Sequence, residues 1–162
     1  MNNTIVLSGD SHANWVFDLT YDNQTGYNPA TGKGALGVEF AGTAVSSPSP
    51  FGANYSYDIH KNITDYYVET NNELLFDPVR GVLTYNRWAE GHYRGYYELH
   101  LTYQNATAYY YGYPNLTSYN TQEYLSAVFT VQAGANAIQR PVAGGTVGYG
   151  SLKNGNSLNH TL

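Results

Sequence analysis

Two tyrosine-rich runs with a period of two constrain the fold more than any other feature of this sequence. They span residues 93–103 (YRGYYELHLTY) and 106–113 (ATAYYYGY), and Gln104-Asn105 separates them. Successive side chains of a strand point to opposite faces of a sheet. The alternation therefore predicts two antiparallel strands joined by a two-residue hairpin connection at Gln104-Asn105.

The rest of the chain contains shorter strand signals and one helix signal. Stretches that are β-branched or that alternate in polarity predict further strands at residues 4–7, 36–45 and 125–131, and residues 15–20 form a second apolar-rich stretch. We expect the first of these strands to be buried. Apolar residues at spacings of three, four and seven predict a helix over 58–75, with His60 on its solvated face. These segments together predict an α+β fold that is rich in strands.

The composition changes after residue 133. Residues 134–162 are rich in Gly and Asn and show almost none of the periodicity that builds a core. We therefore divide the chain into a folded part, residues 1–133, and an irregular tail, residues 134–162, that covers it or is disordered.

Charge and cysteine content exclude several classes of function. The formal net charge is −5 at pH 7, and the seven Lys and Arg residues are scattered along the chain. Nucleic-acid binding needs a clustered basic surface, so we expect no nucleic-acid partner. No apolar run approaches the ~18 residues of a membrane helix, so we expect no membrane span. The absence of cysteine excludes disulfides, thiolate metal sites and cysteine nucleophiles within the chain.

Acceptor sites for N-glycosylation are more frequent than chance predicts. Random placement of Ser and Thr would give roughly 2.6 such sites. The sequence has seven, which begin at Asn2, Asn23, Asn54, Asn62, Asn105, Asn115 and Asn159. This excess favours a glycosylated, secreted or extracellular protein, although a general richness in Asn and Thr would produce a similar pattern. The first residues lack the basic and apolar regions of a signal peptide, so we expect a secretion signal to lie upstream.

The best candidates for a chemical role are Asp10 and His12, in the segment Gly9-Asp10-Ser11-His12 that directly follows the first predicted strand. A carboxylate beside an imidazole suits iron, manganese or zinc, and the carboxylate alone would suit calcium. The alternative is a turn aspartate next to a surface histidine. His92 is a further candidate that a loop could bring to the same site.

These residues lie in a stretch that resembles a known family. Residues 6–15 (VLSGDSHANW) are similar to the C-terminal metal motif of PhoD-like alkaline phosphatases (alkaline phosphatase D), which belong to the metallophosphatase superfamily. The resemblance continues at 37–48 (GVEFAGTAVSSP), and more loosely at 93–99 (YRGYYEL) and 129–134 (FTVQAG).

The resemblance implies a fold and a chemistry. Residues 1–133 would be the C-terminal part of a metallophosphatase-type β-sandwich flanked by helices. The activity would be hydrolysis of phosphate monoesters or diesters at a centre that contains iron and calcium, with Asp10 and His12 among the metal ligands. The resemblance assigns no catalytic side chain to this chain, and it gives no role to Glu39, Ser46, Ser47 or Arg94, although all lie in similar stretches.

The family's other ligand motifs, including a cysteine, lie upstream of the region that this chain resembles. Each ion needs four or more donors, so we expect the chain to be inactive alone. We expect exposed sheet edges to be covered by the upstream part of the same domain or by self-association. The alternative hypothesis is a non-catalytic, glycosylated, β-rich extracellular module that self-associates or binds carbohydrate through its tyrosines.

Overall fold

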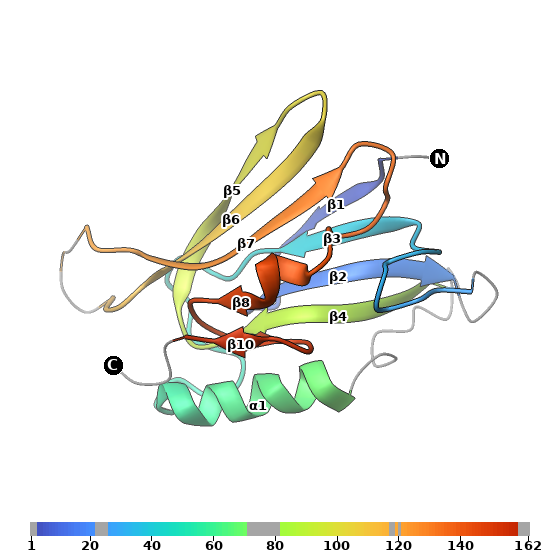
Figure 1. Ribbon diagram of the computed structural model, residues 1–162. Helices are drawn as coiled ribbons and strands as arrows, with labels where there is room; N and C mark the ends of the chain where they lie inside the picture. The colour runs from blue at the N-terminus through green and yellow to red at the C-terminus, as the bar shows by residue number, and fades with distance from the viewer. Residues whose placement is uncertain (1–2, 22–25, 71–81, 117–118, 120, 159–162) are drawn as a thin grey trace.

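The computed structural model describes residues 3–21, 26–70, 82–116, 119 and 121–158 (Figure 1). The described chain is mostly β-strand with a single α-helix, so the prediction of a β-rich α+β fold is confirmed. No helix among these residues is long and apolar enough to cross a membrane.

The larger of the two main sheets has five strands and mixed pairing. In spatial order they are β1 (Ile5–Ser8), β3 (Gly37–Ala41), β2 (Asn14–Tyr21), β4 (Val82–Glu90) and β9 (Ser151–Leu152). β1 runs parallel to β3, whereas the other neighbours are antiparallel. The sheet therefore has two different ends, one formed by β1 and the other by β9.

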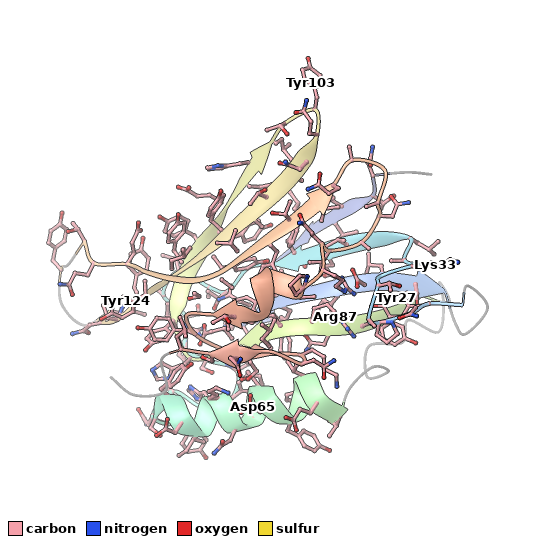
Figure 2. All side chains as sticks on the ribbon, in the orientation of Figure 1. Tyr27, Lys33, Asp65, Arg87, Tyr103 and Tyr124 are labelled. Atoms are coloured by element: carbon pink, nitrogen blue, oxygen red, sulfur yellow. The ribbon has the colours of Figure 1, made fainter. Side chains whose placement is uncertain are left out.

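The second main sheet is an antiparallel meander of β5 (Arg94–Leu101), β6 (Asn105–Tyr113) and β7 (Tyr124–Gln132). The predicted hairpin is confirmed, but its connection lies one residue earlier than expected. Leu101 pairs with Ala106, and the Thr102 N–H donates to the Asn105 carbonyl oxygen at 2.8 Å. The two-residue connection is therefore Tyr103-Gln104, and the Tyr103 side chain projects from its tip (Figure 2).

The two sheets pack face to face around an aromatic core. The Trp88 ring of β4 lies 5.0 Å from the Tyr110 ring of β6 and 5.3 Å from the Phe129 ring of β7, measured between centroids. All three side chains are buried, and Phe40 of β3 joins the same cluster. Burial of side chains of this size contributes about 1.5–3 kcal/mol each to the free energy of folding.

Helix α1 (Tyr57–Thr70) packs against β4 and β9, at the end of the larger sheet opposite β1. The predicted helix is confirmed up to residue 70, and residues 71–75 lie outside the described part of the chain. Its predicted orientation was wrong, because His60, Thr64 and Val68 face the protein whereas Ile59 is exposed. The buried stripe is stabilised by polar partners, such as the Ser151 hydroxyl, which lies 2.7 Å from that of Thr64.

The segment after residue 133 is irregular but takes part in the core. It contains the turn η1 (Val142–Gly145) and the parallel pair β8 (Thr146–Val147) and β10 (Asn156–Ser157), and it supplies β9 to the larger sheet. The buried side chain of Asp18 in β2 binds the beginning of this segment. That carboxylate accepts hydrogen bonds from the Ile138 N–H at 3.0 Å and from the Arg140 guanidinium at 2.5 Å.

One strand prediction was wrong, and one strand was missed. β1 was expected to be buried, but it lies at the edge of its sheet, and Val6 and Leu7 are 39% and 56% exposed. β4 was not predicted at all. Its sequence hides the usual alternation because Asn86, Arg87 and Glu90 are buried polar residues.

Candidate functional site

Asp10 and His12 lie in the turn that joins β1 to β2. Both residues adopt the left-handed backbone region, with φ of 70° and 56°, and the Ser11 N–H donates to the Gly9 carbonyl oxygen at 2.9 Å. Asp10 is exposed and His12 is half-buried. Two left-handed residues other than glycine in one short turn are uncommon, and such conformations cluster at functional sites.

The surroundings of His12 fix which ring nitrogen carries the proton. Its Nδ1 lies 3.1 Å from the carbonyl oxygen of Pro48. A carbonyl only accepts hydrogen bonds, so Nδ1 is the donor and Nε2 of the neutral ring keeps its lone pair. Histidines that ligate metals typically donate their other ring N–H in this way.

A buried arginine connects this turn to the neighbouring loops. Arg94, at the start of β5, is only 4% exposed. Its Nη1 donates to the carbonyl oxygens of His12 at 2.7 Å and Ser47 at 3.1 Å, and its Nη2 donates to those of Gly91 at 3.0 Å and His92 at 3.3 Å. Burial lowers the pKa of the guanidinium, an effect that the charge of Glu90 opposes.

Glu90, the last residue of β4, is a fully buried carboxyl group that lies opposite Asn14 of β2. Its oxygens accept hydrogen bonds from the backbone N–H groups of His92 (2.6 Å) and Tyr93 (3.0 Å), and from the Asn14 amide at 3.4 Å. Asn14 in turn accepts from the Thr43 N–H at 2.9 Å. Burial raises the pKa of Glu90 to about 7, against the opposing effect of these hydrogen bonds and of Arg94.

His92 was proposed to join Asp10 and His12 in the β1–β2 turn. Its ring instead pairs with the ring of His60. The two Nδ1 atoms are 2.9 Å apart, and His60 Nε2 donates to the Gly52 carbonyl oxygen at 2.9 Å. The neutral His60 ring therefore accepts at Nδ1, and His92 is the donor. Burial, the nearby His60 and Arg94 lower the pKa of His92 to about 4. The expectation that His60 is solvated was wrong, since its side chain is buried.

Two other residues from the family-like stretches, Glu39 and Ser47, have structural partners. Glu39 accepts a hydrogen bond from the Ser8 hydroxyl at 2.6 Å, and Ser47 contributes its carbonyl to Arg94. The roles of Arg94, Glu90 and Asn14 were missed by sequence reasoning. Their partners lie up to 82 positions away in the chain, and no local pattern signals such contacts.

Asp10 and His12 do not form a complete metal site with other described residues. The described residues contain no group of three or more His, Asp or Glu side chains that could hold an ion together. An exposed carboxylate at Asp10 and a free Nε2 at His12 fit iron or a similar ion in donor chemistry, but not in number. An ion bound here would need donors in addition to these two side chains.

The predicted glycosylation sites differ in their exposure to solvent. Asn54, Asn62 and Asn115 are exposed, whereas Asn105 is half-buried at the start of β6. The remaining three, Asn2, Asn23 and Asn159, lie outside the described residues.

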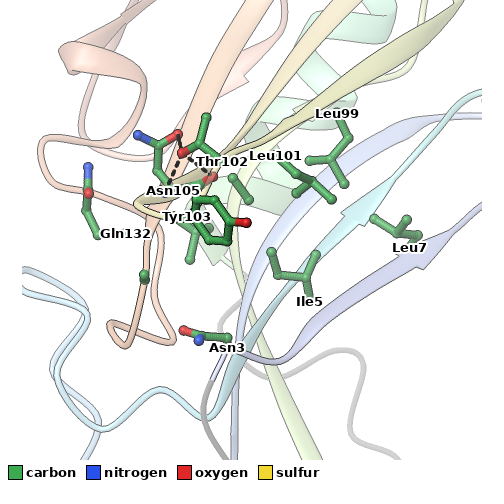
Figure 3. Close-up of a pocket in the computed structure, with 12 residues that line it drawn as sticks. Asn3, Ile5, Leu7, Leu99, Leu101, Thr102, Tyr103, Asn105 and Gln132 are labelled. Atoms are coloured by element: carbon green, nitrogen blue, oxygen red, sulfur yellow. Dashed lines mark hydrogen bonds between the residues drawn. The ribbon is translucent and has the colours of Figure 1, made fainter.

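An apolar groove of about 430 Å³ opens between β1 and the β5–β6 hairpin. Leu99 and Leu101 of β5 face Ile5 and Leu7 of β1 across it (Figure 3). Among the described strands β1 pairs only with β3, so the outer edge of β1 is open beside this groove.

Comparison with known proteins places these features in a family context. The family model for PhoD-like phosphatases matches residues 1–110. The solved structure of PhoD is similar to this chain, with 23% sequence identity and a TM-score of 0.60. The match covers 98% of this chain and 25% of that one, so the chain spans about a quarter of the length of the solved relative. That likeness shows the fold. No protein in the curated set matches the chain.

Proposed function

Because the chain belongs to the PhoD-like phosphatase family, we propose that it is the C-terminal part of a secreted, metal-dependent phosphomonoesterase or phosphodiesterase. Asp10 and His12 would supply two ligands to a centre that holds iron and calcium. The bound ions would polarise the phosphoryl oxygens of a phosphate ester and lower the pKa of a coordinated water. No side-chain nucleophile of this chain is needed for that chemistry.

The hydrogen bond between the His12 ring and the Pro48 carbonyl is the observation that carries this proposal. With Nδ1 as the donor to Pro48, the lone pair of the neutral ring is on Nε2, the atom that would bind a cation. Metal binding would otherwise compete with a proton on that atom. The adjacent carboxylate of Asp10 is exposed and therefore accessible to an ion.

We propose that the remaining ligands come from the upstream part of the same domain and that this part packs on the edge of β1. The open strand edge offers backbone hydrogen bonds, and the apolar groove beside it offers side-chain burial. With two ligands alone, the 162-residue chain would be inactive.

The test compares two proteins, this chain and a longer chain that includes the upstream part of the domain. Hydrolysis of p-nitrophenyl phosphate and of bis(p-nitrophenyl) phosphate is measured with metal content for each. We expect activity and bound metal in the longer protein only, and loss of both in Asp10→Asn and His12→Asn. Asp58→Asn and His100→Asn change exposed residues outside the turn and serve as matched controls. If Asp10→Asn and His12→Asn retain full metal content, the assigned ligands are wrong.

Secretion is supported by the exposed acceptor sites at Asn54 and Asn62. Expression through a eukaryotic secretory pathway should add glycans at both positions, and Asn54→Gln and Asn62→Gln should each remove one glycan mass. An unmodified chain in the medium would contradict this part of the proposal.

A further inference from the structure

Arg94 holds together three connections that are distant in the sequence. They are the β1–β2 turn, the segment that follows β3 and the link between β4 and β5. Its guanidinium reaches one or more backbone carbonyls in each of them. The planar guanidinium has five N–H donors in a fixed arrangement, so the positions of these carbonyls are set relative to one another.

One nitrogen of Arg94, Nη1, contacts both backbone segments that form the hydrogen bond of the His12 ring. Nη1 of Arg94 bonds the backbone of His12, which carries the ring donor, and the backbone of Ser47, which directly precedes the ring's acceptor, Pro48. Both sides of the Nδ1–H···O=C hydrogen bond are therefore attached to the same atom of Arg94. A change at Arg94 would release the donor and the acceptor together.

We propose that Arg94 is a positioning residue that fixes the tautomer and orientation of His12. It acts through the backbone and does not itself contact the ring. The inference rests on the proposed function only in that the Nε2 atom so presented would bind a metal ion. The effect on the His12 ring itself requires no metal.

Burial makes this arrangement specific to arginine. Burial disfavours the charged form of the side chain, and hydrogen bonds to four carbonyls compensate for the water that it loses. Lysine has a compact ammonium group that cannot reach four carbonyls in a planar fork. Arg94→Lys would keep the charge but lose part of this bonding.

The first test follows the His12 ring in the metal-free 162-residue chain by ¹⁵N NMR, at a pH where the ring is neutral. We expect the Nδ1–H tautomer of His12 to dominate in the protein without substitutions. In Arg94→Lys and Arg94→Ala, a mixture of both tautomers should appear, and ethylguanidinium should restore the original signal in Arg94→Ala. Circular dichroism identifies conditions under which each variant is folded. Arg94→Lys keeps the test possible if Arg94→Ala does not fold.

Arg87→Lys is the matched control. Arg87 is a second buried arginine that donates to the carbonyls of Tyr85 and Pro29 rather than to the β1–β2 turn. Its substitution should lower stability without changing the His12 tautomer. The proposal is overturned if folded Arg94 variants keep the Nδ1–H tautomer, or if Arg87→Lys changes it equally.

A second measurement separates this inference from the proposed function. In the longer protein, Arg94→Lys should weaken metal binding by about 10–100-fold, the usual effect of losing a group that orients a ligand. A changed tautomer with unchanged metal affinity would support the positioning of His12 and count against its role as a ligand.

Discussion

At the scale of single residues, Glu90 and the His60–His92 pair have opposite responses to pH. Burial raises the pKa of Glu90 and lowers those of His60 and His92. The folded state therefore favours the neutral form of all three groups. In mildly acidic solution, protonation of Glu90 stabilises the fold, whereas protonation of the histidines destabilises it. The contribution of one group must be measured against a variant that lacks it.

Glu90→Gln should become more stable relative to the unmodified protein as pH rises. The pKa of Glu90 is about 7 in the folded state and about 4.5 in the unfolded chain, so its contribution is present below pH 4.5 and lost as pH rises through 7. The neutral amide does not titrate. Between pH 4.5 and 8, the difference in unfolding free energy should shift by up to about 3 kcal/mol in favour of the variant.

Urea denaturation of both proteins at several pH values in this range measures that difference. Parallel stability curves would show that burial of Glu90 does not penalise its charged form. Glu123→Gln, which changes a carboxylate on an exposed side chain, is the control for a general effect of removing one negative charge.

At the scale of elements, the β5–β6 hairpin depends on a pair of glycines. Gly95 and Gly112 are directly opposite each other in the register. A Cβ atom at Gly95 would lie 1.9 Å from the Tyr111 carbonyl oxygen, and one at Gly112 would lie 2.8 Å from the Tyr93 Cβ. The backbone of β6 therefore leaves no room for a side chain at Gly95, and the Tyr93 side chain restricts Gly112.

Gly95→Ala should therefore destabilise the protein by roughly 2 kcal/mol or more, because the backbone of β6 must move to make room. Gly9→Ala is the matched control. Its Cβ would meet only the Gly42 carbonyl oxygen at 4.0 Å, and its φ is not in the left-handed region. Thermal unfolding compares the two, and equal loss of stability in both would contradict the close approach of the strands.

The elements also show what local sequence patterns can predict. The period-two runs predicted β5 and β6, since one face of each strand is apolar and packs in the sandwich. The same reasoning missed β4 and misoriented α1. Buried positions such as Arg87 and His60 are polar there, and their partners Pro29 and His92 lie 58 and 32 positions away in the chain. Sequence patterns detect burial of apolar side chains, but not burial that distant hydrogen bonds make possible.

Sequence patterns likewise predicted only part of the candidate site. Asp10 and His12 stood out because a short polar motif follows an apolar strand. The supporting contacts from Arg94, Glu90 and Asn14 come from three different strands. They become visible only when the register of both sheets is known.

At the scale of the whole molecule, the two ends of the larger sheet differ in what covers them. Helix α1 and the last strands cover the β4 and β9 end. Among the described strands, none pairs with the outer side of β1, which borders the apolar groove between the sheets. Asn62 is exposed on α1, so a glycan there would leave the open edge accessible (Figure 1).

We therefore expect the isolated 162-residue chain to self-associate through this edge. Leu7 and Leu101 are 56% and 69% exposed and line the groove, and unpaired edge strands pair readily with one another. Leu7→Lys and Leu101→Lys should shift the sedimentation behaviour toward monomer, because lysine at an edge opposes strand pairing. Ile59→Lys, on the exposed face of α1, should leave association unchanged. A monomer at every concentration, or an equal effect of Ile59→Lys, would show that this edge does not drive association. In the longer protein the same two substitutions should lower stability instead, since the upstream part of the domain would then cover the groove.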